Sequence, residues 1–465
     1  MRKSGKMLDK DRAREIFERI RKLSSAEEVE LMVSGGQSAL TRFANNAITQ
    51  NVAEENYVAS LRVLFDGRTA RASTNRYDDE SLRRMVAEAE SLAKVQQRDP
   101  DLLALPTPEE TGRASTPNRQ VARTAAIDAG QRADAVAGMV GIAKRERLTA
   151  AGTFAVSEQM EVLLNSRGVD LYHAQTLAEA SVTMLAENSS GWQKSNSFDI
   201  DNIDALGLAE KAAEKAKRSA NPQELAAGKY TVILEPAAVL DLVGFLFWDF
   251  GGMALVDQRS FLNNRIGQKI FGENITIADD VYHPLQTGAA FDGEGMRRTR
   301  VELVKNGVIK NLVYARSSAR QLARSPFASQ LGTPRPTGHG FPLPNEMGEA
   351  PINIVFEAPG AAQTLEQMVS ESERAVYVTR LWYIREVDPY EKILTGMTRD
   401  GTFLVENGAI GKGILNFRFN ESLLHMLSNV VAMGAPVRAS GEESFDMVVP
   451  AMKVNGFNFT EVTKF

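Results

Sequence analysis

The spacing of apolar residues changes along the chain and predicts a mixture of helices and strands. In some segments apolar side chains recur every three or four residues, as in amphipathic helices. We expect helices of this kind over 9–23, 78–95, 119–138 and 206–221. In others apolar and polar residues alternate, as in half-buried strands. We expect strands of this kind over 29–34, 39–52, 57–66 and 68–75, and further alternating strands within 139–186.

Two turn signals in the second half of the chain predict antiparallel hairpins. Asn306-Gly307 and Asn407-Gly408 each separate two stretches of alternating apolar residues. Asn-Gly is a strong hairpin signal because both residues tolerate the positive φ of a type I′ turn. Between the hairpins, the segment 325–351 is rich in Pro and Gly, which predicts a long loop. Whether this loop acts as a lid stays open.

The chain is longer than one hydrophobic core usually supports, and its composition changes near Asn221-Pro222. We therefore expect an α+β protein with two domains. Residues 1–225 would form a mixed domain of antiparallel strands with flanking helices. Residues 226–465 would form a domain with a curved, antiparallel, barrel-like sheet and a buried helix.

The longest apolar stretch, 236–256, is about long enough to span a bilayer. It contains Asp241 and Asp249, and each Asp at a membrane centre would cost about 2.5–3.5 kcal/mol. We therefore expect a buried core helix that ends near Phe250. The N-terminus lacks the apolar segment of a secretory signal, so we expect a cytoplasmic protein and no membrane partner.

Composition narrows the chemistry. The formal charge is −5, which argues against a general nucleic-acid surface. The chain has no Cys, so disulfides, Cys-based zinc sites and thiol nucleophiles are excluded. The four histidines, His173, His283, His339 and His425, are isolated in sequence. Glu421 precedes His425 by one helical turn, which favours an ion pair over a metal site.

The segment 379–389 (TRLWYIREVDP) combines arginines, aromatics and carboxylates. One interpretation is a strand followed by a turn that an Arg–carboxylate cluster holds. The other is one wall of a peptide-binding chamber, since Arg binds carboxylates and carbonyls and Trp and Tyr provide rigid contact area. The candidate residues for that wall are Arg380, Trp382, Tyr383, Arg385 and Asp388.

Several segments resemble the TldD/PmbA family of bacterial and archaeal proteins. They are 259–262 (RSFL), 291–311 (FDGEGMRRTRVELVKNGVIKN), 379–389 and 395–408 (TGMTRDGTFLVENG). The resemblance implies a choice between zinc peptidases and a sister branch without zinc. The zinc branch carries a His-Glu…His motif on the helix that follows the first strand of its C-terminal domain, and a Cys near the C-terminus.

The positions where the two motif histidines would fall hold Gly244 and Asp249, and no Cys exists. The resemblance is therefore to the PmbA/TldE-like branch, with no metal and no cofactor in this chain. It implies a non-catalytic subunit that pairs with a TldD-like zinc peptidase. The pair would enclose a chamber for extended or unfolded peptides.

Two alternatives stay open. One is a homodimeric peptide-binding or regulatory protein without proteolytic activity. The other is a hydrolase that uses carboxylates such as Asp249, Asp292 or Glu294. Asp292 and Glu294 belong to the segment 291–295 (FDGEG), for which a structural turn is the first interpretation.

Overall fold

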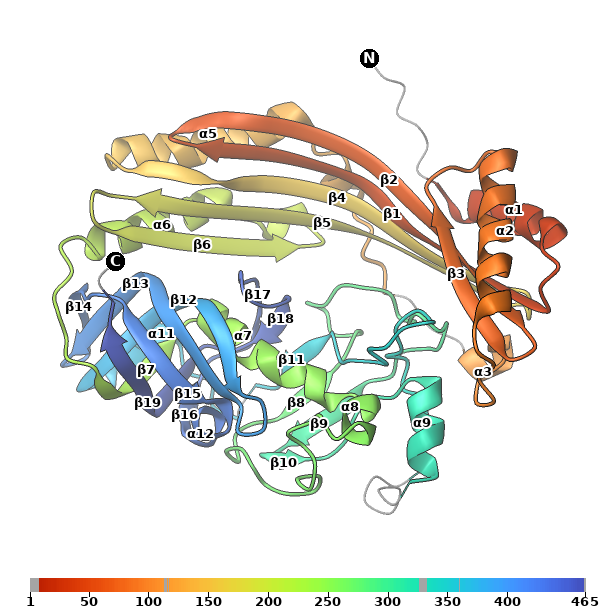
Figure 1. Cartoon of the computed structure of the whole chain (residues 1–465). Helices are drawn as coiled ribbons and strands as arrows, with labels where there is room; N and C mark the ends of the chain where they lie inside the picture. Colours follow the sequence, from red (N-terminus) through yellow and green to blue (C-terminus); the bar gives the residue numbers. More distant parts are fainter. Residues whose placement is uncertain (1–7, 113–114, 116, 326–332, 359, 464–465) are drawn as a thin grey trace.

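A long curved sheet arches over a C-terminal unit whose strands close into a barrel in the computed structural model (Figure 1). The structure describes residues 8–112, 115, 117–325, 333–358 and 360–463. Helices and mainly antiparallel sheets occur together, which confirms the predicted α+β class. The division into domains 1–225 and 226–465 stays a prediction.

The arching sheet has six strands that pair only in antiparallel fashion. They are β1 (Glu28–Ala44), β2 (Ala47–Phe65), β3 (Arg68–Thr74), β4 (Thr149–Asn165), β5 (Asp170–Leu185) and β6 (Ser190–Ser197). Their order across the sheet is β3-β2-β1-β4-β5-β6. Successive side chains of a strand point to opposite faces of the sheet, so the alternating pattern of the sequence places every second side chain on the face that helices cover.

Helices cover the two ends of this sheet (Figure 1). The longer ones are α1 (Lys10–Leu23) and α2 (Asp79–Val95) at one end, and α5 (Ala129–Arg145) and α6 (Ala205–Arg218) at the other. Short turns of helix form α3 (Pro108–Thr111), α4 (Ala122–Ala125) and η1 (Ile200–Asn202). The helix predicted at 119–138 is wrong in its bounds. Asp128 caps the true start, because its side chain accepts the N–H of Gln131.

The barrel confirms the curved sheet predicted for the second half. Its strands are β7 (Gly228–Leu234), β12 (Arg374–Asp388), β13 (Ile393–Glu406), β15 (Phe417–Ser422) and β19 (Met452–Val462). They pair in the order β12-β7-β19-β15-β13, and β13 also pairs with β12, so the ring is closed. Two further strands extend it, β14 (Ala409–Gly413) on β13 and β16 (Val430–Met433) on β19.

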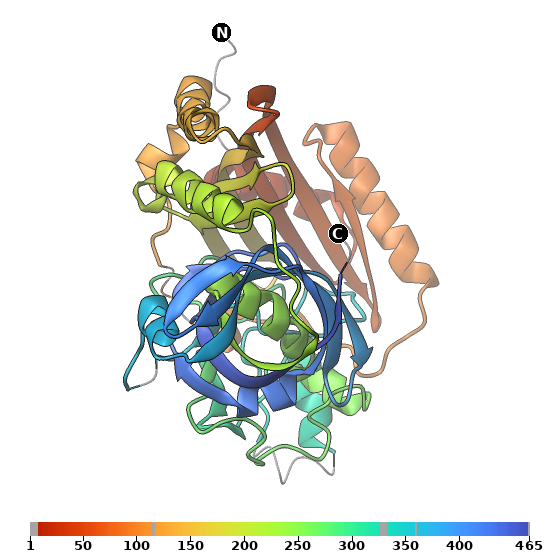
Figure 2. The same ribbon diagram turned by 90° about the vertical axis from the view of Figure 1, so that its left-hand side faces the viewer.

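The predicted buried helix lies within this ring (Figure 2). It consists of α7 (Pro236–Val243), which tightens into the 3₁₀ helix η2 (Gly244–Phe250), and α8 (Gly252–Val256) follows. A helix that is apolar on all sides is stable only when protein surrounds it. No helix in the described ranges is long and apolar enough to cross a membrane.

A second six-stranded sheet lies beside the barrel. Its strands are β8 (Ile277–Asp279), β9 (Val301–Lys305), β10 (Val308–Ile309), β11 (Ile354–Phe356), β17 (Val437–Ala439) and β18 (Met447–Val449). Helices α9 (Arg316–Ala323), α11 (Leu365–Ser370) and α12 (Leu423–Ser428) complete the C-terminal half.

Both predicted Asn-Gly hairpins form, and all four turn residues have positive φ. Of the predicted loop 325–351, residues 326–332 lie outside the described part of the chain. Residues 333–351 contain no helix or strand, which agrees with the prediction for that portion.

The barrel core is built from stacked aromatic rings. Phe417 is fully buried, and its ring centroid lies 4.6 Å from that of Phe459. We expect Phe417→Ala to lower the free energy of unfolding by about 3–5 kcal/mol, because it leaves a cavity in a closed core. Urea denaturation measures this loss. Val387→Ala, at an exposed position of β12, is the control and should cost less than about 1 kcal/mol.

Candidate functional site

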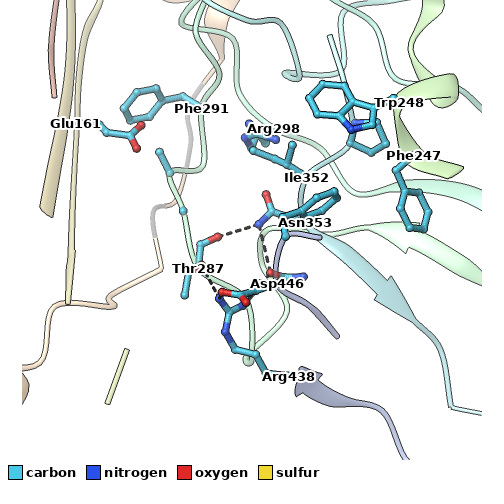
Figure 3. A pocket seen from close by; sticks show the side chains of 15 residues that line it. Glu161, Phe247, Trp248, Thr287, Phe291, Arg298, Ile352, Asn353, Arg438 and Asp446 are labelled. Carbon is cyan, nitrogen blue, oxygen red and sulfur yellow. Dashed lines mark hydrogen bonds and ion pairs between the residues drawn. The ribbon is translucent and has the colours of Figure 1, made fainter. Parts of the chain in front are cut away.

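A pocket of about 400 Å³ lies between the arching sheet and the C-terminal half (Figure 3). Glu161 of β4 faces it from the sheet, and Phe247 and Trp248 of η2 face it from the barrel side. The other lining residues come from the loops and strand ends of the second sheet: Gln286, Thr287, Gly288, Ala289, Phe291, Arg298, Pro351, Ile352, Asn353, Arg438, Phe445 and Asp446. The pocket therefore adjoins the segment where the resemblance places a zinc motif.

Position 244 has no room for a side chain. A Cβ atom built on Gly244 would lie 1.8 Å from Oγ and 2.6 Å from Cβ of Ser444. It would also lie 3.3 Å from the terminal methyl of Met447. A histidine at this position would require the segment around Ser444 to move. A histidine therefore does not fit, as the chain is packed here, at one of the two positions where the zinc motif of the family would place one.

Position 249 carries a carboxylate that is already paired. Asp249 forms an ion pair with Lys392, which is only 3 % exposed, and accepts the N–H of Phe261 at 3.0 Å. Burial raises the pKa of Asp249, and the lysine opposes that shift. Lys392 also contacts Glu386 at 2.8 Å. Asp249 therefore serves the packing between η2 and the β12–β13 turn.

The five predicted chamber residues lie on or at the end of β12, but they do not face one space. Arg380 is buried, lies 3.4 Å from Asp400 and packs over the ring of Trp192 on β6 at 4.6 Å. The guanidinium of Arg399 lies 3.6 Å from the ring centroid of Trp382. Arg380 thus joins the barrel to the arching sheet.

The remaining three candidates lie nearer the surface. Tyr383 is half exposed, has a positive φ of 57°, and lies under the guanidinium of Arg385 at 4.6 Å. Its N–H donates to Glu443 at 2.8 Å. Asp388 accepts the N–H groups of residues 390 and 391 at 2.9 Å and so fixes the turn. A peptide-binding role for these residues stays a prediction.

The structure identifies pocket residues that sequence reasoning missed. Arg298 is 8 % exposed, and its Nη1 atom has no hydrogen-bond partner in the described chain. Asn353 is also buried, and its Oδ1 atom has no partner there. Arg298 lies within the segment that resembles the family, but nothing in its sequence neighbourhood distinguishes it from Arg297 or Arg300.

The carboxylates of 291–295 serve a turn, as first interpreted. Asp292 accepts N–H groups of Glu294 at 2.9 Å, Met296 at 2.8 Å and Gly340 at 2.7 Å. Glu294 accepts the N–H of Arg316 at 2.8 Å. Burial, together with the Asp292 charge, raises the pKa of Glu294 to about 8. Both side chains are buried.

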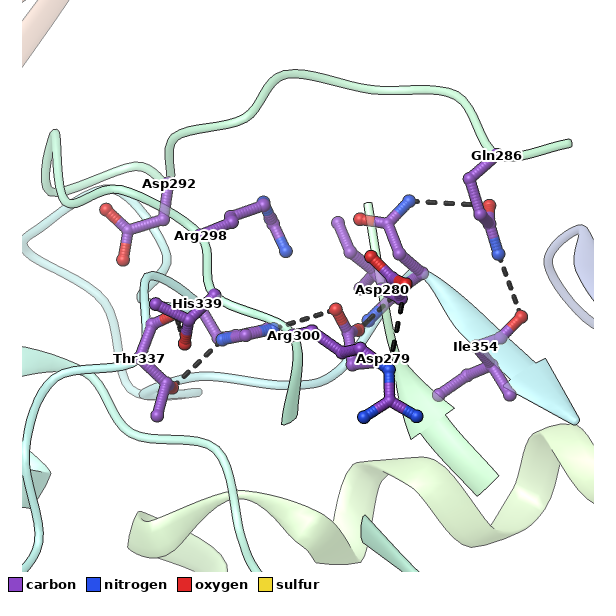
Figure 4. A network of polar contacts seen from close by, with 12 residues as sticks. Asp279, Asp280, Gln286, Asp292, Arg298, Arg300, Thr337, His339 and Ile354 are labelled. Carbon is purple, nitrogen blue, oxygen red and sulfur yellow. Dashed lines mark hydrogen bonds and ion pairs between the residues drawn. The ribbon is translucent and has the colours of Figure 1, made fainter. Parts of the chain in front are cut away.

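The histidines are dispersed. His339 is buried and lies 2.9 Å from Asp279 and 2.9 Å from Thr337 (Figure 4). His425 contacts Glu421 at 2.6 Å, so the predicted ion pair forms, although Glu421 belongs to β15. Among the described residues no three His, Asp or Glu side chains are grouped so that they could hold a metal ion.

Family models match three successive parts of the chain. PmbA/TldA metallopeptidase domain 1 matches 29–93, the central domain matches 116–220 and the C-terminal domain matches 227–461. The chain belongs to the PmbA/TldD family. The metalloprotease PmbA of Escherichia coli O157:H7 is 24% identical to this chain and aligns over 93% of both chains.

Two further similarities are partial or structural. An uncharacterised protein of Methanocaldococcus jannaschii is 34% identical over 158 residues, which are 33% of this chain and 36% of that protein. The crystal structure of TldE from Thermococcus kodakarensis superimposes with a TM-score of 0.82 at 20% identity. It covers 96% of this chain and 99% of that one, so this member of the PmbA/TldD family shares the TldE fold.

Because Asp249 and Lys392 form a buried ion pair, we expect that removing one partner lowers the free energy of unfolding strongly. Asp249→Ala leaves a buried lysine with only Glu386 beside it, and we expect a loss of about 3–5 kcal/mol in unfolding free energy. Replacing both residues, as in Asp249→Leu with Lys392→Met, should recover most of that loss. Glu391→Ala removes a half-exposed ion pair with Arg265 and should cost less than about 1 kcal/mol. A single-variant loss no larger than this control would contradict the assignment.

Asp241 of α7 predicts a pH dependence of stability. Burial is the main cause that raises its pKa to about 7, although its carboxylate accepts the N–H of Glu443 at 3.1 Å. An acid whose pKa is higher in the folded state binds its proton more tightly there. Its contribution to stability therefore falls as pH rises from about 4 to about 7.

Asp241→Asn keeps an oxygen acceptor and removes this titration. We expect the variant to gain stability over the wild type progressively from pH 5 to pH 8, reaching roughly 2–4 kcal/mol. Urea denaturation at each pH measures the difference. A difference that stays constant across this range would show that Asp241 does not titrate there.

Proposed function

We propose that this chain is the zinc-free, PmbA/TldE-like subunit of a heterodimeric metallopeptidase. A TldD-like partner would hold the zinc ion and supply the hydrolytic water. This chain would complete a chamber for extended or unfolded peptides in the cytoplasm. Membership of the PmbA/TldD family supports an association with a metallopeptidase. The non-catalytic role of this chain is the part that we propose.

The packing at positions 244 and 249 carries the proposal. A catalytic zinc site needs about three protein ligands and one open position for water. Here one predicted ligand position has no space for a side chain, and the other holds a carboxylate neutralised by a buried lysine. The third predicted ligand would be a Cys, and the chain has none.

The pocket beside η2 supports a role in peptide binding. It combines exposed aromatic surface, through Trp248, with two buried polar atoms that have no hydrogen-bond partner among the described residues, Nη1 of Arg298 and Oδ1 of Asn353. Apolar walls with a few polar groups that are available for hydrogen bonding are typical of sites that bind organic ligands.

The hydrolase alternative can be separated from this proposal by a near-isosteric change. Because the pKa of Glu294 is about 8, this group is mostly protonated at neutral pH, and Glu294→Gln imitates that state. We expect the variant to fold normally and the peptidase activity of the heterodimer to persist. Loss of activity in Glu294→Gln, with unchanged unfolding, would favour the carboxylate mechanism.

The main test compares this chain alone with a complex. We expect the purified chain to contain far less than one equivalent of zinc and to cleave no unfolded peptide. Co-expression with the TldD-like protein of the same host should give a heterodimer that cleaves such peptides. Elemental analysis, size-exclusion chromatography and a peptide-cleavage assay measure these outcomes.

Replacing the motif histidines of the partner should abolish cleavage and leave the complex intact. Two results would overturn the proposal. One is tightly held zinc with turnover in this chain alone. The other is a stable homodimer that does not associate with the TldD-like protein, which would support the homodimeric alternative.

A further inference from the structure

Two arginines line the pocket between β4 and η2, the half-buried Arg438 and the buried Arg298, and their surroundings differ. Arg438 donates to Thr287 at 3.2 Å and lies 3.2 Å from Asp446, so its charge is neutralised. Arg298 is more deeply buried, at 8 % exposure, but no ion pair joins it to a carboxylate in the described chain, and its Nη1 atom has no partner there. A buried charge without a partner costs several kcal/mol, so this arrangement is expensive unless a ligand completes it.

Two buried carboxylates in the vicinity of Arg298, Asp279 and Asp292, contact other groups (Figure 4). Asp279 lies 2.9 Å from His339 and accepts the N–H groups of residues 352 and 353 at 2.7 and 2.8 Å. Asp292 accepts the N–H groups of its own turn and of residue 340. The charge of Arg298 acts to lower the pKa of both carboxyls, although no hydrogen bond or ion pair joins it to either one in the described chain. The hydrogen-bonding capacity of the guanidinium therefore remains available.

Glu161 is the only titratable carboxylate besides Asp446 that lines the same pocket in the described chain. It belongs to β4, across the pocket from η2, and it makes no ion pair with Arg298 (Figure 3). Desolvation by the surrounding protein raises the pKa of this carboxyl, although its side chain is exposed, and the nearby charge of Arg298 opposes that shift. It does not neutralise the arginine directly.

The rest of the pocket matches a ligand with an apolar part and an N–H donor. Phe247, Trp248, Phe291 and Ile352 provide apolar walls. The Trp248 ring is held by Phe341, whose ring centroid is 6.1 Å away. Asn353 donates from Nδ2 to the carbonyl of residue 287 at 2.8 Å, which leaves its Oδ1 atom without a donor.

We propose that this pocket binds a carboxylate of an apolar peptide, with Arg298 as the anchor and Asn353 as the acceptor for a peptide N–H. Arginine suits this role because its planar fork binds a carboxylate through two parallel hydrogen bonds. A volume of about 400 Å³ accommodates a short peptide segment. The inference deepens the proposed function and rests on it for the choice of peptides as ligands.

The experiment measures binding to the full chain without any partner subunit. The probes are acetyl-Ala-Ala-Phe with a free C-terminal carboxylate, the same peptide as its C-terminal amide, and acetyl-Ala-Glu-Phe amide. Isothermal titration gives the affinities, and Trp248 fluorescence reports occupancy. Binding by the first peptide assigns the C-terminal carboxylate, and binding by the third assigns an acidic side chain. We expect the neutral amide to bind at least about tenfold more weakly than the better of these two.

Variants connect the effect to Arg298. Arg298→Met should weaken carboxylate binding by about 10- to 100-fold and leave the weak binding of the neutral amide unchanged. Arg298→Lys should lie between the wild type and Arg298→Met, because it keeps the charge and loses the fork. Arg300→Met is the matched control. Arg300 belongs to the same segment, pairs with Asp280 at 3.8 Å and does not line the pocket, so affinity should not change.

Thermal unfolding accompanies each titration. Arg298→Met should unfold at the same or a higher temperature than the wild type, because it removes an unpaired buried charge. Equal affinity for the acid and amide peptides, no measurable binding of any peptide, or unchanged affinity in folded Arg298→Met would overturn the inference. These outcomes concern the isolated chain, so they leave the assembly with a TldD-like subunit to be judged by its own test.

Discussion

The enclosure of α7 and η2 by a closed ring of strands is the constraint on which the C-terminal half depends. A closed barrel has no free edge, and its interior must be filled by side chains. Here a helix fills it, so nearly every residue from 236 to 250 faces protein. The enclosure explains why the acid at position 241 has a raised pKa and why Asp249 requires a lysine. Position 244 is glycine for a different reason, since the segment that carries Ser444, between β17 and β18 of the second sheet, lies directly over it.

Polar contacts determine how the arching sheet lies against this barrel. Arg380 packs on Trp192, and Ser190 of β6 donates to Asp400 of β13. Arg119 is buried and donates to the carbonyl of residue 288 at 2.9 Å. Such directional contacts fix one relative position of two surfaces more strictly than apolar packing does. The pocket lies between these surfaces, so its shape depends on the same contacts.

The cost of buried charge connects the proposed function with the pocket. At position 249 the charge is paired with Lys392 within the chain. Arg298 has no ion-pair partner in the part of the chain that the structure describes, and its Nη1 atom has no hydrogen-bond partner there. The same physical rule, that a buried charge is costly without a partner, applies to both residues. Asp249 has its partner within the chain, and Arg298 has none among the described residues.

Local patterns predicted much of the fold. Asn-Gly pairs fixed both hairpins, because few other residues tolerate two successive positive φ values. The helices predicted at 9–23 and 78–95 form, and the side chains of Asp9 and Asp78 cap their starts by accepting the N–H groups of Arg12 and Ser81. The helix at 129–145 was placed too early, because its apolar residues 139–142 (MVGI) suit a strand as well as a helix. The capping box at Asp128 decided between them.

The sequence by itself determined the family resemblance, the absence of Cys and the loss of both motif histidines, because these depend only on residue identity. It could not distinguish Arg298 from its neighbours Arg297 and Arg300. Nor could it show which of the five candidate residues of β12 are exposed and which one contacts the arching sheet. Burial and the presence of a partner depend on segments far apart in the chain. Only the tertiary structure, which brings β4, η2 and the segment 286–298 around one space, decided which of these charges is paired and which is not.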